Sequence, residues 1–214
     1  MGAHVVAVAV AVLGATGGVS QAHAQAGKLG SYSGTINASG TLNSPQVSYR
    51  ATIKLTLPVT QRNASSISAE FLAGEAPNAT ALISQWDITH REKSAGADGK
   101  FASWTCTLAN AVEVPMTPTG VLNVDLKAKK HALSVTLLST KEIALNCKHS
   151  TSGAYKKNQG IALSVGTGTP GMQYLTQLPF SDPAHLSARY TLKPSSPTEE
   201  FGPIVQDWDL RLAP

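Results

Sequence analysis

The stretch QVSYRATIKLTL, residues 46–57, alternates polar and apolar residues over its whole length. A period of two places successive side chains on opposite faces of an extended strand. The stretch therefore predicts a β-strand with one buried and one solvated face, because a helix would scatter the same apolar side chains around its surface. The residues expected to face the core are Val47, Tyr49, Ala51, Ile53, Leu55 and Leu57.

Shorter alternating segments recur along the chain, separated by turn signals such as residues 127–130 and 152–153. Only residues 172–178 show a weak helical period. Many short strands with one dry face each predict an all-β fold, an antiparallel β-sandwich or open barrel of about ten strands. The segments are residues 32–36, 67–71, 82–88, 104–108, 122–126, 133–137, 143–147, 161–165, 186–192 and 204–212.

The first two dozen residues carry no charged side chain and contain an Ala/Val/Leu block that ends at Ala22-His23-Ala24. A short apolar block before a small-x-small site is typical of an export signal, and it is shorter than the roughly 20 residues of a membrane-spanning helix. We therefore expect residues 1–24 to be a signal peptide and residues 25–214 to form a single all-β domain. The expected localisation is secreted or periplasmic, with no transmembrane segment.

The chain has two cysteines, Cys106 and Cys147, and each shares the parity of the apolar residues around it. Paired cysteines are the rule in exported chains, so we predict one disulfide bond between them. Two Pro-containing segments, residues 115–120 and 194–197, are candidate domain boundaries. A bridge across the first of them would tie both halves together, which favours one domain.

Signatures of common catalytic and metal sites are missing, including G-x-S-x-G, S-x-x-K, H-E-x-x-H and C-x-x-C. The run GTGTPG, residues 166–171, has the spacing of a dinucleotide-binding loop. Such a loop needs a helix N-terminus directly after it, and Pro170 interrupts one here, so we interpret the run as a Gly-rich connection between strands. We expect no cofactor and no metal site.

A Trp-Asp pair occurs twice, in ISQWDITHRE (residues 83–92) and in IVQDWDLRLA (residues 204–213). In both copies the Trp falls on the apolar side and the Asp on the polar side. We interpret the echo as a recurring strand pattern, ahead of a decayed duplication or a catalytic pair. Trp86, Trp104 and Trp208 all have core parity, so all three indoles are expected in the interior.

Residues 127–157 hold seven lysines and one acidic residue, a net charge of 7 − 1 = +6. Outside the cytoplasm such a region suits an anionic surface, an acidic polysaccharide or another protein. Nucleic acid is not expected, because no recognition motif is present. Within this region we predict an exposed loop at residues 149–160, with Tyr155, Lys156 and Lys157 as binding residues that combine a flat aromatic face with cationic donors. The alternative is that these lysines only keep sheet edges from pairing.

Together these features favour an exported, non-enzymatic binding or structural β module that recognises an anionic partner through its lysine-rich loop region. Two alternatives stay open. One is a secreted hydrolase in which folding brings His90 or His149 next to a carboxylate. The other is a pilin-like surface-assembly subunit, joined by strand addition through an unpaired groove or through a detachable N-terminal strand within residues 25–45. The sequence does not indicate the oligomeric state.

Overall fold

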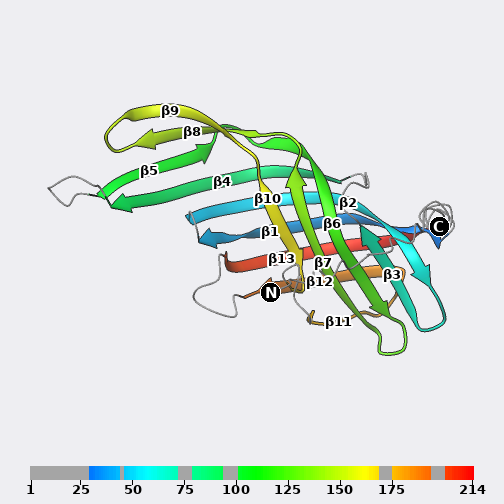
Figure 1. Cartoon of the computed structure of the whole chain (residues 1–214). Helices are drawn as coiled ribbons and strands as arrows, with labels where there is room; N and C mark the ends of the chain where they lie inside the picture. Colours follow the sequence, from blue (N-terminus) through cyan, green and yellow to red (C-terminus); the bar gives the residue numbers. More distant parts are fainter. Residues whose placement is uncertain (1–28, 44–45, 72–78, 94–100, 169–174, 194–200) are drawn as a thin grey trace, which may run out of the picture.

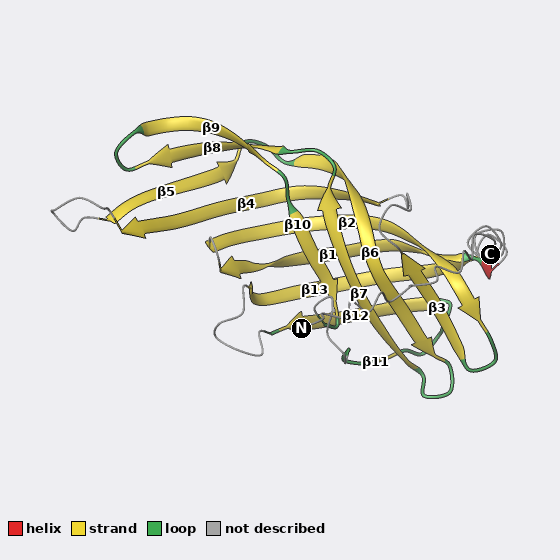
Figure 2. Ribbon diagram, viewed as in Figure 1, coloured by secondary structure: helices red, strands yellow, loops and turns green. Residues whose placement is uncertain are grey.

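The computed structural model describes residues 29–43, 46–71, 79–93, 101–168, 175–193 and 201–214. The predicted signal peptide, the candidate boundary at residues 194–197 and the first half of the weakly helical segment 172–178 lie outside these residues. The described residues form thirteen strands (Figures 1 and 2). They contain no helix long and apolar enough to cross a membrane. The strands are β1 (Ser31–Asn43), β2 (Gln46–Arg62), β3 (Ser66–Phe71), β4 (Ala79–Lys93), β5 (Phe101–Leu108), β6 (Val112–Asp125), β7 (Lys130–Ser139), β8 (Ile143–His149), β9 (Gly153–Gln159), β10 (Ala162–Gly166), β11 (Leu178–Pro179), β12 (His185–Leu192) and β13 (Phe201–Ala213).

All thirteen strands belong to one hydrogen-bonded antiparallel sheet that folds over into two layers. The larger layer has the order β12-β13-β1-β2-β4-β5-β8-β9. The smaller layer is β3-β6-β7, with β10 and β11 paired along the far side of β7. In Figure 1, β6, β7 and β10 cross in front of β13, β1 and β2 at a steep angle. The predicted all-β fold, a sandwich or open barrel with one disulfide, is confirmed.

Two long strands, β2 and β6, connect the layers. Each pairs with β4 over one part of its length and with β3 over another. Proline has no N–H to donate to a ladder, so it is tolerated in a strand only where no donor is needed. Met116 is the last residue of β6 that pairs with β4, and Gly120 is the first that pairs with β3. Pro118 lies between them, where β6 pairs with neither of these strands. The candidate boundary at residues 115–120 is therefore continuous strand.

The core lies between the two layers and follows the alternation seen in the sequence. Each of the six residues of β2 predicted to face the core is at most 3% exposed. Trp86 and Trp208 are also interior, at 2% and 3% exposed. Burying one Leu, Ile or Val side chain is worth about 1.5–3 kcal/mol, so these stripes supply the main driving force for closing the layers.

Two polar side chains of β13 reach across the core to the smaller layer. Gln206 is fully buried; its Oε1 accepts a hydrogen bond from the Gly166 N–H at 2.6 Å, and its Nε2 donates to the Gly166 carbonyl at 3.2 Å. Trp208 Nε1 donates to Nε2 of His131, on β7, at 3.2 Å. Buried polar groups are costly when unpaired, so these bonds favour one alignment of the layers over others.

Strands β5, β8 and β9 extend the larger layer beyond the smaller one, and we call these three strands the wing (Figure 1). Cys106 of β5 and Cys147 of β8 lie directly opposite each other and form the predicted disulfide. Both cysteines are buried, at 0% and 4% exposed. We call the side of the wing that carries them its inner face and the other side its outer face. Strand β9 is the free edge of the wing, since β8 is its only neighbour among the described strands.

Candidate functional site

The segment predicted as an exposed loop, residues 149–160, is instead the turn and second strand of a hairpin. His149 builds the turn, because its Nδ1 accepts a hydrogen bond from the Thr151 N–H at 3.2 Å. Ser150 then fixes the turn to the neighbouring strand: its N–H donates to the Ser103 carbonyl at 2.8 Å, and its Oγ accepts from the Ser103 N–H at 3.1 Å. The loop prediction was wrong because the sequence of β9 contains no apolar alternation that would mark it as a strand.

The three predicted binding residues are all exposed, but they do not form one surface. Consecutive residues of a strand point to opposite faces. Tyr155 pairs with Cys147, so Tyr155 and Lys157 lie on the inner face. Lys156 pairs with Asn146, which is exposed on the outer face. Of the three predicted residues, Tyr155 and Lys157 therefore share one side of the wing, and Lys156 lies on the other.

Trp104 of β5 is the aromatic residue that the sequence placed incorrectly. It is only partly buried and lies on the inner face. The Lys157 Nζ lies 5.3 Å from the centroid of the Trp104 ring. The ring centroid of His90, on β4, lies 5.2 Å from the same Trp104 centroid. A cation over an indole at this distance contributes about 0.5–1 kcal/mol at an exposed site.

The contact between Lys157 and Trp104 spans the disulfide. Cys106 is two residues from Trp104 along β5, and Cys147 pairs with Tyr155, two residues from Lys157 along β9. The two long side chains therefore approach each other diagonally over the bridged cysteines. Both cysteines belong to the hydrophobic core, and Trp104 packs against the edge of that core.

The outer face of the wing is cationic and hydrophilic. Lys148 and Lys156 are diagonal neighbours there, and both are exposed. Thr105 and Thr107 are exposed beside them on β5. Together β5, β8 and β9 contain three lysines and neither Asp nor Glu, a net charge of 3 − 0 = +3. Like charges held together without carboxylates attract an anionic partner.

Three other lysines of the basic stretch lie away from the wing, whereas Lys141 lies two residues before β8. Lys127, Lys129 and Lys130 are at the turn between β6 and β7, at the opposite end of the molecule in Figure 1. The Asp125 carboxylate accepts the Lys127 N–H at 2.9 Å and so stabilises this turn. The run of lysines that looks continuous in the sequence is thus divided between two ends of the fold. A hollow of about 380 Å³ beside the turn is lined by Ser65, Ser66, Ile67, Ser68, Asn123, Val124, Asp125 and Lys127.

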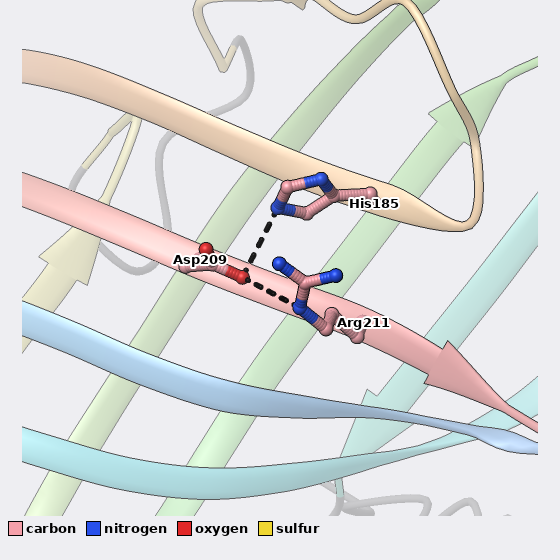
Figure 3. Close-up of polar contacts among 3 residues, drawn as sticks. All are labelled: His185, Asp209 and Arg211. Atoms are coloured by element: carbon pink, nitrogen blue, oxygen red, sulfur yellow. Dashed lines mark hydrogen bonds and ion pairs between the residues drawn. The ribbon is translucent and has the colours of Figure 1, made fainter.

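His185, a histidine that the sequence did not single out, contacts a carboxylate. His185 Nε2 lies 3.1 Å from Asp209 Oδ1, and Arg211 Nε lies 3.4 Å from the same oxygen (Figure 3). This cluster cannot be recognised in the sequence, because only the pairing of β12 with β13 brings His185 beside Asp209. His149 instead caps its own turn, and the ring of His90 packs on Trp104.

The His185 cluster is a surface ion pair between Arg211 and Asp209, with His185 within hydrogen-bonding distance of the same carboxylate. The side chains of His185 and Asp209 are 35% and 51% exposed, and Arg211 shares the carboxylate. Acyl transfer by a Ser-His-Asp arrangement requires a nucleophile on the histidine and an enclosed oxyanion site. The hydrogen bonds of His185 within the described residues include none to a serine or cysteine side chain.

The glycine run that matches a dinucleotide loop has a structural role where it is described. Gly166, the last residue of β10, has a φ of 123°, and a Cβ there would collide with the Leu133 carbonyl of β7. Its N–H is already engaged by Gln206 and cannot bind a phosphate. Residues 169–171 of the run lie outside the described residues. In the described ranges, no three His, Cys, Asp or Glu side chains gather to hold a metal.

Comparison with protein-family models, with curated proteins and with solved structures found no match to this chain. The wing and the His185 cluster are therefore assessed by their own chemistry.

Proposed function

We propose that this protein is an exported, non-enzymatic binding module whose wing recognises a negatively charged polymer. The observation that carries the proposal is the charge of β5, β8 and β9, which hold Lys148, Lys156 and Lys157 and no carboxylate. The hairpin is fixed by its turn and by the disulfide, so a partner would not have to order these strands before binding them.

Location outside the cytoplasm is part of the proposal. The Cys106–Cys147 disulfide supports it, because such bonds persist mainly in oxidising compartments. The leader-like composition of residues 1–24 supports it as well. In such a compartment, anionic polymers and surfaces are the main partners for a cationic face.

Both alternative functions receive less support. A hydrolase would need a histidine with a nucleophile in an enclosed site, whereas His185 contacts Asp209 at the partly exposed surface. A surface-assembly subunit would need an unpaired groove or a strand that can leave the sheet. Strand β1, the N-terminal candidate, is hydrogen-bonded along its length to β2 on one side and to β13 on the other. Removing it would break two ladders at once.

The proposal is tested by retention on immobilised heparin, used as a generic polyanion. The double variant Lys156→Ala with Lys157→Ala should elute at lower salt than the unaltered protein, because it loses two of the three wing charges. A matched control, Lys127→Ala with Lys130→Ala, removes the same net charge at the opposite end of the molecule and should elute close to the unaltered protein.

Equal retention of the wing variant and the unaltered protein would refute the proposal. Equal loss in the two double variants would also refute it, because retention would then follow net charge and not the wing. The thermal unfolding midpoint of each variant should stay close to that of the unaltered protein, since all four lysines are exposed.

A further inference from the structure

We propose that the polymer bound by the wing is an acidic polysaccharide, and that it binds to the inner face. One sugar ring stacks on Tyr155, and Lys157 binds a carboxylate or sulfate of the same sugar or of the adjacent one. This inference rests on the proposed function and adds to it a ligand class and a recognition face. It also assigns distinct roles to two neighbouring residues of β9.

The placement of Tyr155 suits a stacking role. Its side chain is 41% exposed at the free edge of the sheet. Among the wing residues whose side chains are described, it is the only large apolar one that is exposed; the others of this kind in the described residues, Leu82 and Leu138, lie on β4 and β7. A flat ring with one open side offers an apolar platform to a pyranose, while its hydroxyl stays in water.

Lys157 lies beside this platform in a defined position. It is two residues from Tyr155 on the same face, which places the two Cα atoms about 7 Å apart. Its ammonium lies 5.3 Å from the centroid of Trp104, whose ring also packs on His90. A lysine already held over an indole loses less side-chain freedom on binding than one that is fully mobile. An anionic substituent of a sugar on Tyr155 would therefore meet a charge that is fixed nearby.

The remaining surface of the wing favours a polysaccharide over a membrane. Binding to a lipid surface is driven by apolar side chains that enter the acyl boundary. The exposed residues of the outer face are instead hydroxyls, amides and lysines, including Thr105, Thr107, Asn146 and Asn158. Groups of this kind hydrogen-bond to sugar hydroxyls and have no affinity for hydrocarbon.

The test is calorimetric titration of the full-length protein with oligogalacturonate and heparin-derived hexasaccharides, each at several salt concentrations, with maltohexaose as the neutral comparison. Both acidic ligands should bind, and maltohexaose should bind far more weakly. Tyr155→Ala should weaken acidic binding by about three- to tenfold at every salt concentration, because stacking is not screened. Tyr155→Phe keeps the ring and should stay within about twofold of the unaltered protein.

Comparing Lys156 with Lys157 tests which face of the wing binds the polysaccharide. Lys157→Ala should weaken binding of the hexasaccharides and reduce its salt dependence more than Lys156→Ala does, because only Lys157 shares the inner face with Tyr155. An equal effect of the two substitutions would overturn the assignment to the inner face. Circular dichroism spectra of all variants should match that of the unaltered protein.

Other outcomes separate this inference from the proposed function. Unchanged binding by Tyr155→Ala, together with losses in both lysine variants, would overturn the stacking inference and leave the cationic wing in place. Tighter binding of vesicles containing phosphatidylglycerol, or of single-stranded DNA, than of either acidic hexasaccharide would overturn the polysaccharide assignment. Binding that no wing substitution changes would overturn both proposals.

Discussion

Trp208 and His131 face each other across the core, with the indole Nε1 donating to the imidazole Nε2 at 3.2 Å and the ring planes at 85°. Since Nε2 accepts this bond, the histidine is the neutral tautomer with its proton on Nδ1. Desolvation by burial lowers the pKa of His131 below its ordinary value of 6.5. The Leu178 carbonyl opposes this shift, although it does not lie in hydrogen-bonding geometry to Nδ1. The contact between the two layers thus depends on an uncharged imidazole.

Stability should therefore fall in mild acid. The unfolded chain binds a proton at the ordinary histidine pKa, whereas the folded protein binds it only at lower pH. The contribution of His131 is thus complete above about pH 6.5 and is lost as the pH falls through the lowered folded-state pKa. The free energy of unfolding in urea should decrease from about pH 7.5 to about pH 5, and His131→Gln should reduce this decrease. The same pH dependence in the variant would contradict the role assigned to His131.

Gln206 makes the second polar contact between the layers, and replacing it should be costly. Gln206→Leu keeps the approximate size of the side chain but leaves the buried N–H of Gly166 without its partner. We expect a loss of about 2–3 kcal/mol in unfolding free energy, measured by urea denaturation monitored by tryptophan fluorescence. Gln61→Leu, at an exposed position on β2, is the control and should change stability by less than about 0.5 kcal/mol. Similar effects of the two substitutions would argue against a buried contact at Gln206.

The disulfide should stabilise the protein substantially. The bridge joins cysteines 41 residues apart, and on the chain-entropy model it disfavours the unfolded state by about 4 kcal/mol. Thiol titration of the denatured, unreduced protein should find no free sulfhydryl, because both cysteines are paired. The double variant Cys106→Ala with Cys147→Ala should be about as unstable as the reduced protein. Two reactive thiols before reduction would contradict the pairing.

Trp104 should be the tryptophan most accessible to quenchers. The indoles of Trp86 and Trp208 are 2% and 3% exposed, whereas Trp104 is partly exposed on the wing. Acrylamide should quench a fraction of the emission, and Trp104→Phe should remove most of that fraction. If the quenchable fraction were unchanged in the variant, Trp104 would have to be as deeply buried as the other two.

The sequence predicts strands well where one face of the strand is covered. Every residue of β2 that the alternation predicts to face the core is buried, because burial in the core selects an apolar residue at each second position. The two Trp-Asp copies follow the same rule: Trp86 and Trp208 are buried, and Asp209 lies outward in an ion pair. The echo is adequately explained as a strand pattern.

The candidate site was predicted less well, for two physical reasons. Strand β9 lies at a free edge with most of its side chains exposed, so its seven residues have no apolar alternation and their sequence predicts a loop. The positions of Trp104 and His185 depend on which strands are neighbours. Contacts such as Lys157 with Trp104 or His185 with Asp209 arise only from strand pairing. The sequence was enough to choose Tyr155, Lys156 and Lys157 as candidate binding residues. Which of them share a face of the wing follows only from the pairing register of β9 with β8.

The most direct test of the wing as the binding face is an amide chemical-shift titration of isotopically labelled protein with a heparin-derived hexasaccharide. We predict that the largest shift changes fall on residues 103–108 and 143–159, centred on Tyr155 and Lys157. Changes concentrated at the turn between β6 and β7, or on β12 and β13 around Asp209, would contradict this account.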